Sequence, residues 1–250
     1  MYIVFFDFDQ TFKNPNIISE KDINFFNSFL KDNKAVILSE ASITELINYT
    51  KSYHFNMDLF SISNQILYED GIYNYELIDE KIISEIETKF NDDIYTAYGE
   101  GINTTYIFKY QERLKPIYPP ERINSKSLTS INVVIYNQKY DEFRDYLDKH
   151  NLSYVVVAKD LKKAILRIQK TNFTKDKIVE LYKIKYPNNI YVGISDSIND
   201  LKFIEKCDIK IAMKNADDEL KKHVDIITNY NYNESGAIKI LDNISKFKKV

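Results

Sequence analysis

Residues 2–11 read Tyr-Ile-Val-Phe-Phe-Asp-Phe-Asp-Gln-Thr, an apolar, β-forming run that ends in two carboxylates. An uninterrupted apolar run that turns polar at once is typical of a strand buried on both faces of a parallel sheet. Ligands of such open α/β sheets bind outside the carboxyl ends of the strands. Because residues two apart in an extended chain project the same way, we expect Asp7 and Asp9 to lie over one binding site.

Two further runs, at residues 35–38 and 190–194, have the same apolar character and also end in polar residues. Between the first two strands, Ser19 begins a capping-box-like sequence with Asp22 in place of Glu, and apolar residues follow at helical spacing. Strand, helix and strand in this order form a βαβ unit. We further expect a helix at 42–51, a strand at 60–63 and a hairpin turn at 68–71.

The pattern changes between residues 79 and 169, where the regular alternation of strand and helix stops. We expect there helices at 79–90 and 139–150, strands at 131–136, 154–157 and 164–168, an alternating segment at 104–110, and a loop through Pro116, Pro119 and Pro120. From residue 174 the alternation resumes. We expect helices at 174–185 and near 199–206, a strand at 209–212, and short elements at 217–223 and 225–228.

These elements predict an α/β protein with a Rossmann-like parallel sheet core, built from residues 1–78 and 170–250. An α+β domain at residues 79–169 interrupts this core, and its size is compatible with a small independent domain. The chain has 250 residues, of which 44% are apolar, and this is enough for two hydrophobic cores.

The composition excludes several classes of function. The 34 basic and 37 acidic residues leave a formal charge of −3, so we expect no nucleic-acid partner. No apolar stretch approaches the roughly 20 residues that a membrane span needs, so we expect no membrane partner. Cys207 is the only cysteine, which excludes an internal disulfide and favours a reducing, cytoplasmic location. The five glycines form neither a Walker loop nor a dinucleotide-binding fingerprint.

A second acidic cluster, Asp196-Ser197-Ile198-Asn199-Asp200, follows the strand expected at 190–194. Two acidic strand ends in one sheet would repel each other, and a hard divalent cation resolves that repulsion. Carboxylate, carbonyl, water and phosphate oxygens are the ligands that Mg²⁺ prefers. One carboxylate of the first pair can then attack an electrophile while the other handles a proton. The structural alternative is that Asp7 and Asp9 cap a turn and that Asp196 and Asp200 cap a helix.

Ser39 and Lys175 add groups suited to an anion. Ser39 ends the strand at 35–38, and its hydroxyl can donate to a phosphate oxygen, although a serine at such a junction also serves as a helix cap. Lys175 follows Thr174 at an expected helix start, where the helix dipole favours an anion. A cation there is locally unfavourable, which indicates an anionic partner; the alternative is an ordinary solvated lysine.

Taken in chain order, the first acidic cluster, Ser39, Lys175 and the second acidic cluster resemble the motifs of the haloacid dehalogenase superfamily of phosphohydrolases. The similarity covers nearly the whole chain. The first motif is matched by residues 7–11, the second by Ser39, the third by Lys175 and the fourth by residues 195–200. Residues 211–216, Ile-Ala-Met-Lys-Asn-Ala, resemble the segment that follows the fourth motif in the Cof-type subfamily. The resemblance implies that residues 79–169 are a C2-type cap, whose closure selects the substrate and excludes water.

The resemblance also implies roles for the site residues. Asp7 would be the nucleophile that forms an aspartyl-phosphate, and Asp9 would protonate the leaving alcohol and then activate water. Mg²⁺ would be bound by Asp7, the main-chain carbonyl of Asp9, Asp196 and, through water, Asp200. The phosphoryl group would be held by Ser39, Lys175 and Asn199, together with Thr11, which would also brace the loop.

The implied activity is Mg²⁺-dependent hydrolysis of a small phosphorylated metabolite, such as a sugar phosphate, by a monomer or weak homodimer. The sequence departs from the family pattern at Gln10, Glu40, Asp176 and Ser195. At these positions the family usually has Gly, at position 40 as part of a Gly-Arg pair, and Gly tolerates backbone conformations that other residues avoid. Two alternatives therefore stay open: a phosphomutase of the same fold, and a non-catalytic phosphate or metal sensor that has lost turnover.

Overall fold

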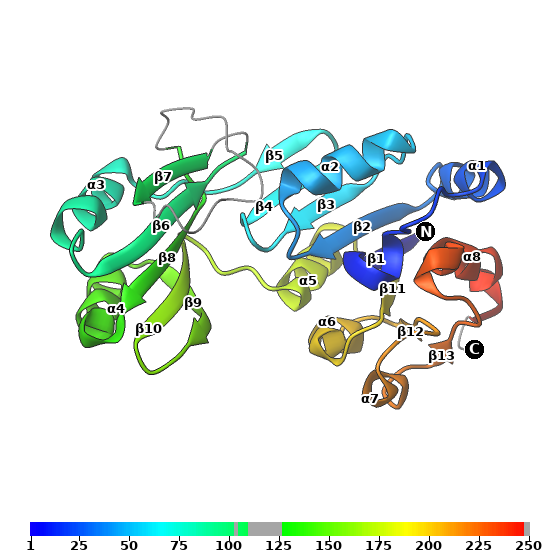
Figure 1. Ribbon diagram of the computed structural model, residues 1–250. Helices are drawn as coiled ribbons and strands as arrows, with labels where there is room; N and C mark the ends of the chain where they lie inside the picture. Colours follow the sequence, from blue (N-terminus) through cyan, green and yellow to red (C-terminus); the bar gives the residue numbers. More distant parts are fainter. Residues whose placement is uncertain (103–104, 110–126, 248–250) are drawn as a thin grey trace. The chain divides into compact units, whose positions relative to one another are not determined.

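The opening apolar stretch forms a central strand of a parallel sheet. In the computed structural model, which describes residues 1–102, 105–109 and 127–247, this stretch is strand β1 (Tyr2–Asp7), followed by a helical turn, η1 (Phe8–Phe12). Strand β1 pairs in parallel with β2 (Lys34–Ser39) on one side and with β11 (Ile190–Ser195) on the other (Figure 1). The predicted α/β class with a parallel sheet core is confirmed.

The order of strands in this sheet is β13-β12-β11-β1-β2-β3-β4-β5. The outer strands are β3 (Asp58–Ser61), β4 (Ile66–Glu69), β5 (Ile72–Asn74), β12 (Ile209–Ala212) and β13 (Ile226–Ile227). From β1 the chain proceeds outward through β2 and β3, and it later fills the other half through β11 and β12. Ligands of open α/β sheets bind at such a switch point, beside the carboxyl ends of the central strands.

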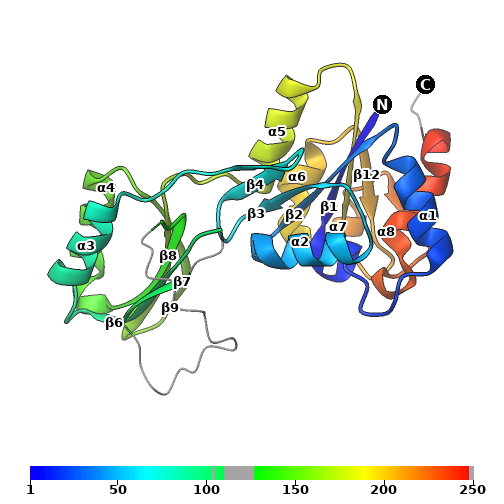
Figure 2. The same ribbon diagram turned by 90° about the horizontal axis from the view of Figure 1, so that it is seen from above.

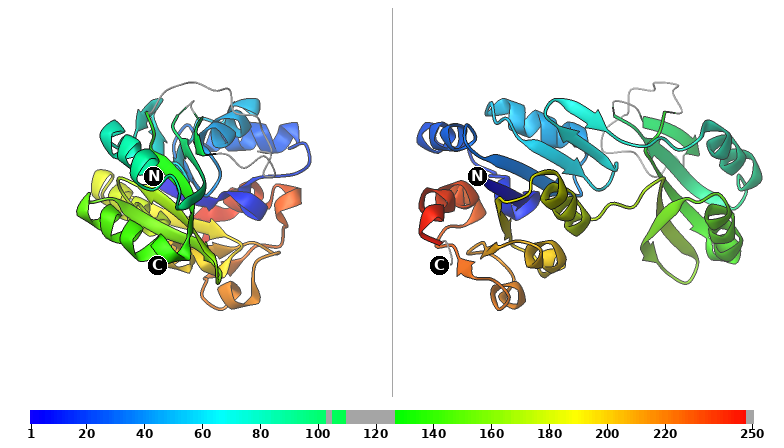
Figure 3. Two further views of the ribbon diagram at one scale, coloured as in Figure 1. Left: turned by 60° about the vertical axis from the view of Figure 1, so that its left-hand side comes forward. Right: turned by 180° about the vertical axis from the view of Figure 1, so that it is seen from behind.

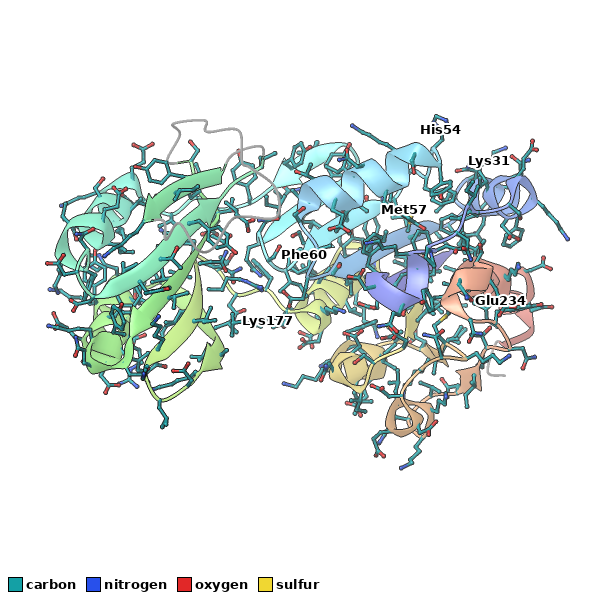
Figure 4. The ribbon with its side chains drawn as sticks, in the orientation of Figure 1. Lys31, His54, Met57, Phe60, Lys177 and Glu234 are labelled. Atoms are coloured by element: carbon teal, nitrogen blue, oxygen red, sulfur yellow. The ribbon has the colours of Figure 1, made fainter. Side chains whose placement is uncertain are left out.

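Helices cover both faces of this sheet, which is why its strands are almost uniformly apolar (Figure 2). Helices α5 (Lys175–Lys185) and α6 (Leu201–Glu205) share a buried apolar cluster with Phe5 of β1 and with Phe60 of β3, labelled in Figure 4. On the other face, Phe6 of β1 packs against Phe26 of α1 (Glu20–Phe29). Further helices are α2 (Ile43–Ser52), α7 (Asp218–Lys221) and α8 (Gly236–Lys239).

Local sequence signals set several boundaries as expected. The hydroxyl of Ser19 accepts a hydrogen bond from the main-chain N–H of Asp22 at 3.2 Å, and α1 begins there. Ser42 caps α2 in the same way through the N–H of Glu45. The predicted hairpin turn joins β4 to β5, and its central residues, Asp70 and Gly71, have φ of 49° and 86°. Two successive left-handed residues are what a two-residue hairpin turn requires.

The strand expected at 60–63 begins earlier, because β3 spans Asp58–Ser61. Its first residue is a carboxylate that is only 5% exposed. Asp58 Oδ2 accepts hydrogen bonds from Lys34 Nζ at 3.2 Å and from the Tyr182 hydroxyl at 2.9 Å. Both partners are distant in the sequence, so no local pattern indicates that this aspartate is buried.

The chain divides into two compact units. The first contains residues 1–62 and 67–72 and the described residues from 173 onward, and the second contains residues 63–66 and the described part of 73–172. The second unit has an antiparallel sheet of order β7-β6-β8-β10-β9, and the boundaries predicted at residues 79 and 169 stay predictions. Its strands are β6 (Ile94–Glu100), β7 (Thr105–Lys109), β8 (Ser130–Tyr136), β9 (Ser153–Lys159) and β10 (Lys163–Gln169).

Helices α3 (Glu80–Lys89) and α4 (Tyr140–Lys149) lie side by side on one face of this antiparallel sheet (Figure 3). The sequence pattern does not predict β6, which contains Gly99. A Cβ at this glycine would lie 2.3 Å from the side chain of Leu128, so a larger residue would require that side chain to move. The predicted loop through Pro116, Pro119 and Pro120, like residues 104 and 110 of the alternating segment, lies outside the described residues.

Membrane-spanning helices are not found in the part of the chain that the structure describes, since no helix there is both long and apolar enough.

We expect the substitution Asp58→Ala to lower the free energy of unfolding by about 2–3 kcal/mol. The substitution removes the acceptor that the buried Tyr182 hydroxyl and the Lys34 ammonium share. Urea denaturation followed by circular dichroism measures the change, and Asp32→Ala, at an exposed aspartate, is the control. An equal effect of the two substitutions would contradict this role of Asp58.

Candidate active site

The carboxyl ends of three neighbouring strands bring the predicted site residues to one edge of the sheet. Strand β1 ends at Asp7, β2 at Ser39 and β11 at Ser195. The register sets the ends of β1 and β2 level, because Asp7 pairs with Leu38. Residues from opposite ends of the chain therefore lie side by side, as the neighbouring β1 and β11 in Figure 1 show.

A single ammonium group joins two of the predicted carboxylates. Lys175 is the first residue of α5, and its Nζ lies 2.6 Å from Oδ1 of Asp7 and 2.6 Å from Oδ1 of Asp200. The three side chains are 15%, 14% and 7% exposed, so these charge-assisted hydrogen bonds are largely shielded from water. The structure thus brings together residues that the sequence places in three separate motifs.

Two hydroxyl groups connect the second acidic loop to the rest of the site. Thr11 Oγ1 donates to Oδ1 of Asp196 at 2.7 Å, and Ser195 Oγ donates to Oδ2 of Asp200 at 2.6 Å. Ser195 Oγ also accepts a hydrogen bond from the N–H of Ser197 at 3.2 Å. The proton of the Thr11 hydroxyl is therefore engaged by Asp196, in keeping with a bracing role, and its contact to a phosphoryl group stays a prediction.

Asp9 has different surroundings from Asp7. Its side chain is 64% exposed, and its Oδ1 lies 3.5 Å from Nζ of Lys13, which also donates to Glu45 of α2 at 2.7 Å. The next residue, Gln10, has φ of 58°. This left-handed conformation is free of strain for glycine and costs other residues about 1–2 kcal/mol. Gln10 therefore adopts the conformation that suits the glycine usual at this position in the first motif.

Ser39 and Asn199 are the predicted phosphate ligands with the least direct structural support. Ser39 is 2% exposed, and its hydroxyl oxygen accepts a hydrogen bond from the N–H of Ala41 at 2.9 Å, which fixes the turn before α2, whereas the helix cap is Ser42. Asn199 is exposed, and its main-chain N–H donates to Ser197 Oγ. Among the described residues, no hydrogen bond joins the side chain of Asn199 to the carboxylates, and its role stays a prediction.

Burial and crowding of like charge perturb the acidic groups. Burial raises the pKa of Asp7 from its ordinary value of 3.8 to about 7; Asp200 and Asp196 add to this effect, and Lys175 opposes it. Burial also raises the pKa of Asp196. For Lys175, burial lowers the pKa, but Asp7 and Asp200 together raise it above its usual value. One ammonium therefore does not compensate the negative charge of this edge of the sheet.

Mg²⁺ fits this set of donors. Three carboxylates, those of Asp7, Asp196 and Asp200, share the ends of the strands, and burial together with neighbouring carboxylates raises the pKa of Asp7 and of Asp196. Within the described ranges, no three His, Cys, Asp or Glu side chains form a ready-made cage for a metal ion. Mg²⁺ requires no such cage, because it keeps several waters and binds one or two carboxylates together with substrate phosphate. Asp7 and Asp196 would hold it, with Asp200 and the main-chain carbonyl of Asp9 as further oxygen donors.

Two residues at the site have no role assigned from the sequence. Asn215 Nδ2 donates to the main-chain carbonyl of Gln10 at 2.9 Å. Asp217 Oδ2 accepts from the N–H of Ile198 at 2.8 Å, and the N–H of Asp217 donates to the carbonyl of Asp196 at 2.8 Å. Asn215 lies within residues 211–216, the segment that resembles a family segment, and Asp217 follows it. The resemblance alone predicts no contact for either residue.

Comparison with known proteins assigns the fold to a family. A family model described as haloacid dehalogenase-like hydrolase matches residues 4–241. An uncharacterized protein from Mycoplasma capricolum subsp. capricolum is 20% identical over 228 residues, which cover 81% of this chain and 86% of that protein.

Solved structures share the same fold. A protein from Thermotoga maritima has a TM-score of 0.70 at 21% identity, with 100% of this chain and 99% of that chain covered. A Bacteroides thetaiotaomicron protein, one of the phosphatases of the haloalkanoate enzyme superfamily, has a TM-score of 0.69 at 14% identity, with 98% and 95% covered. At these identities the likeness shows the fold alone.

We expect the stability of the metal-free protein to depend on Asp7 and on pH. Because the pKa of Asp7 is about 7 in the folded protein and 3.8 ordinarily, ionising this residue destabilises the fold as the pH rises between these values. Asp7→Asn does not ionise. In EDTA, the free energy of unfolding of Asp7→Asn relative to wild type should therefore increase from pH 5 to pH 8, by at most about 3 kcal/mol.

Urea denaturation at the two pH values measures this difference. Asp32→Asn, at an exposed aspartate, should show no such trend. A difference between Asp7→Asn and wild type that is the same at pH 5 and pH 8 would contradict the raised pKa.

Proposed function

Because this chain belongs to the haloacid dehalogenase-like hydrolases, we propose that it is a Mg²⁺-dependent phosphatase that transfers a phosphoryl group from a small phosphate ester to Asp7 and then to water. The contact of Lys175 Nζ with Asp7 and Asp200, at 2.6 Å each, is the observation that carries the proposal. It supplies a buried cation directly beside a buried carboxylate at the carboxyl end of a central strand.

The first step forms a bond between Asp7 and phosphorus. An ionised Asp7 oxygen attacks the phosphorus atom, and the bond from phosphorus to the ester oxygen breaks. Asp9, which is exposed and not held by Lys175, gives its proton to the departing oxygen and so releases an alcohol. Lys175 binds the phosphoryl oxygens as negative charge shifts among them. When bound, Mg²⁺ would neutralise phosphoryl charge and favour the ionised form of Asp7.

The second step regenerates the enzyme. Asp9, now a carboxylate, takes a proton from water as the water oxygen attacks phosphorus. The bond between phosphorus and the Asp7 oxygen breaks, so inorganic phosphate leaves and Asp7 returns as a carboxylate. Thr11 and Ser39 keep the loops of the site in place through their hydrogen bonds to Asp196 and to the N–H of Ala41.

The site and the composition support a small substrate. The buried cluster of Lys175, Asp7 and Asp200 offers one ammonium group to a phosphoryl group, and the net charge of −3 does not favour a polyanion. We therefore extend the proposal to a small phosphorylated metabolite, such as a sugar phosphate, selected by the second unit acting as a cap. Cys207 is buried and free, which is consistent with a reducing, cytoplasmic location.

The test is phosphate release from a panel of sugar phosphates, pyridoxal phosphate, FMN and p-nitrophenyl phosphate. We expect release with Mg²⁺ and none in EDTA, and a loss of at least roughly 1,000-fold in Asp7→Asn, because the covalent step requires that carboxylate. Asp32→Asn should retain wild-type activity. Release by Asp7→Asn at a rate close to that of the wild type would exclude Asp7 as the nucleophile.

A second test separates the role of Asp9 from that of Asp7. In Asp9→Asn, we expect kcat/KM for an alkyl phosphate to fall by roughly 100-fold or more, because its leaving oxygen needs a proton. For p-nitrophenyl phosphate, whose leaving group is stable as an anion, kcat/KM should fall much less. Equal losses for the two esters would argue against Asp9 as the general acid.

A further inference from the structure

The main chain that follows Asp9 is held from one side by Asn215. Gln10 has φ of 58°, a left-handed conformation that residues other than glycine adopt only where their surroundings fix it. The carbonyl of Gln10 accepts a hydrogen bond of 2.9 Å from Nδ2 of Asn215. This bond constrains the peptide group between Gln10 and Thr11, the second peptide group after Asp9.

Asn215 is itself firmly anchored. Its Oδ1 accepts a hydrogen bond of 3.1 Å from the N–H of Tyr232, which begins a helical turn, η4 (Tyr232–Glu234). A capping box between Asn231 and Glu234 fixes this turn, and Glu234 is labelled in Figure 4. Within the described residues, the side chain of Asn215 therefore joins Gln10 to a rigid turn.

The residues around Asn215 fix the second acidic loop at the same time. The N–H of Met213 donates to the carbonyl of Ser195 at 2.9 Å, and the N–H of Asp217 donates to the carbonyl of Asp196 at 2.8 Å. The segment 213–217 thus binds both loops that carry carboxylates. Within this segment, the side-chain amide of Asn215 makes the contact to the first loop, at Gln10.

Other contacts also act around Asp9. Its side chain is 64% exposed and pairs with Lys13 at 3.5 Å, and exposed ion pairs of this kind hold a side chain only loosely. Thr11, two residues on, is fixed by Asp196 at 2.7 Å. Before Asp9, the carbonyl of Phe8 accepts a hydrogen bond of 2.8 Å from the N–H of Lys13, and after it the hydrogen bond from Asn215 restrains the carbonyl of Gln10.

We propose that Asn215 is a positioning residue for the acid–base step: it holds Gln10 in its left-handed conformation and thereby sets the position of Asp9. This inference rests on the proposed function. Asn215 acts through the loop of Asp9 and not on Asp7 or Lys175, so its loss should affect steps that need a proton from Asp9 and spare attack by Asp7.

The test compares Asn215→Ala with wild type on two esters in Mg²⁺. For an alkyl phosphate, we expect kcat/KM to fall roughly 10-fold, a part of the effect of general acid catalysis. For p-nitrophenyl phosphate, which needs no proton on its leaving group, kcat/KM should stay within about 3-fold of wild type. A purely structural role of Asn215 would lower both values equally, and that result would overturn the inference.

A second test variant and a control variant complete the experiment. Asn215→Asp keeps the acceptor for the N–H of Tyr232 and removes the donor to Gln10, so it should show the same selective loss if Asn215→Ala does not fold. Asn189→Ala is the matched control, because Asn189 Nδ2 also donates to a main-chain carbonyl, that of Tyr186 at 2.8 Å, away from both loops. It should leave both esters unaffected.

A double substitution tests the link to Gln10. If Asn215 acts through this residue, Gln10→Gly combined with Asn215→Ala should lose no more alkyl phosphatase activity than the more impaired single variant. Losses that multiply would overturn the link. Wild-type protein that releases phosphate from neither ester would refute the proposed function, and the inference with it, whereas an active wild type with equal losses in Asn215→Ala refutes the inference alone.

Discussion

Excess negative charge at the carboxyl ends of β1 and β11 is the constraint on which the rest of the site depends. Asp7 and Asp196 lie close because their strands are neighbours, and Asp200 adds a third carboxylate. The ammonium of Lys175 offsets part of this charge, and the pKa of Asp7 still stays near 7 because of burial and the other two carboxylates. Such a site attracts a phosphate ester only together with a cation, so binding of metal and of substrate should be coupled.

Much of the core could be predicted from the sequence, because its signals are local. Apolar runs that end in polar residues located β1, β2 and β11, and Ser19 and Ser42 located the starts of two helices. The features that the sequence did not reveal depend on distant partners. Asp58 is buried because Lys34 and Tyr182 bind it, and β6 tolerates Gly99 because Leu128 fills the space. The same signal located the carboxylates of the predicted site, because Asp7 ends β1 and the cluster at 196–200 follows β11.

Two departures from the family pattern have local compensation. Gln10 adopts a left-handed conformation, and its carbonyl accepts a hydrogen bond from Asn215. Ser195 is fully buried, and its hydroxyl donates to Asp200. The structure thus accommodates the strained backbone of Gln10 and the side chain of Ser195, and Asp7 and Asp200 stay in contact with Lys175. These accommodations support a working phosphatase over a sensor that has lost turnover.

The pairing of β1 with β11 also bears on how the protein is made. Tyr2 pairs with Ile190, so one edge of the most apolar strand has no partner until most of the chain has left the ribosome. At typical rates of protein synthesis, that delay is on the order of 10–40 s. An unpaired apolar strand is prone to aggregation during this time. Expression at lower temperature or with chaperones should therefore matter more for this chain than its size suggests.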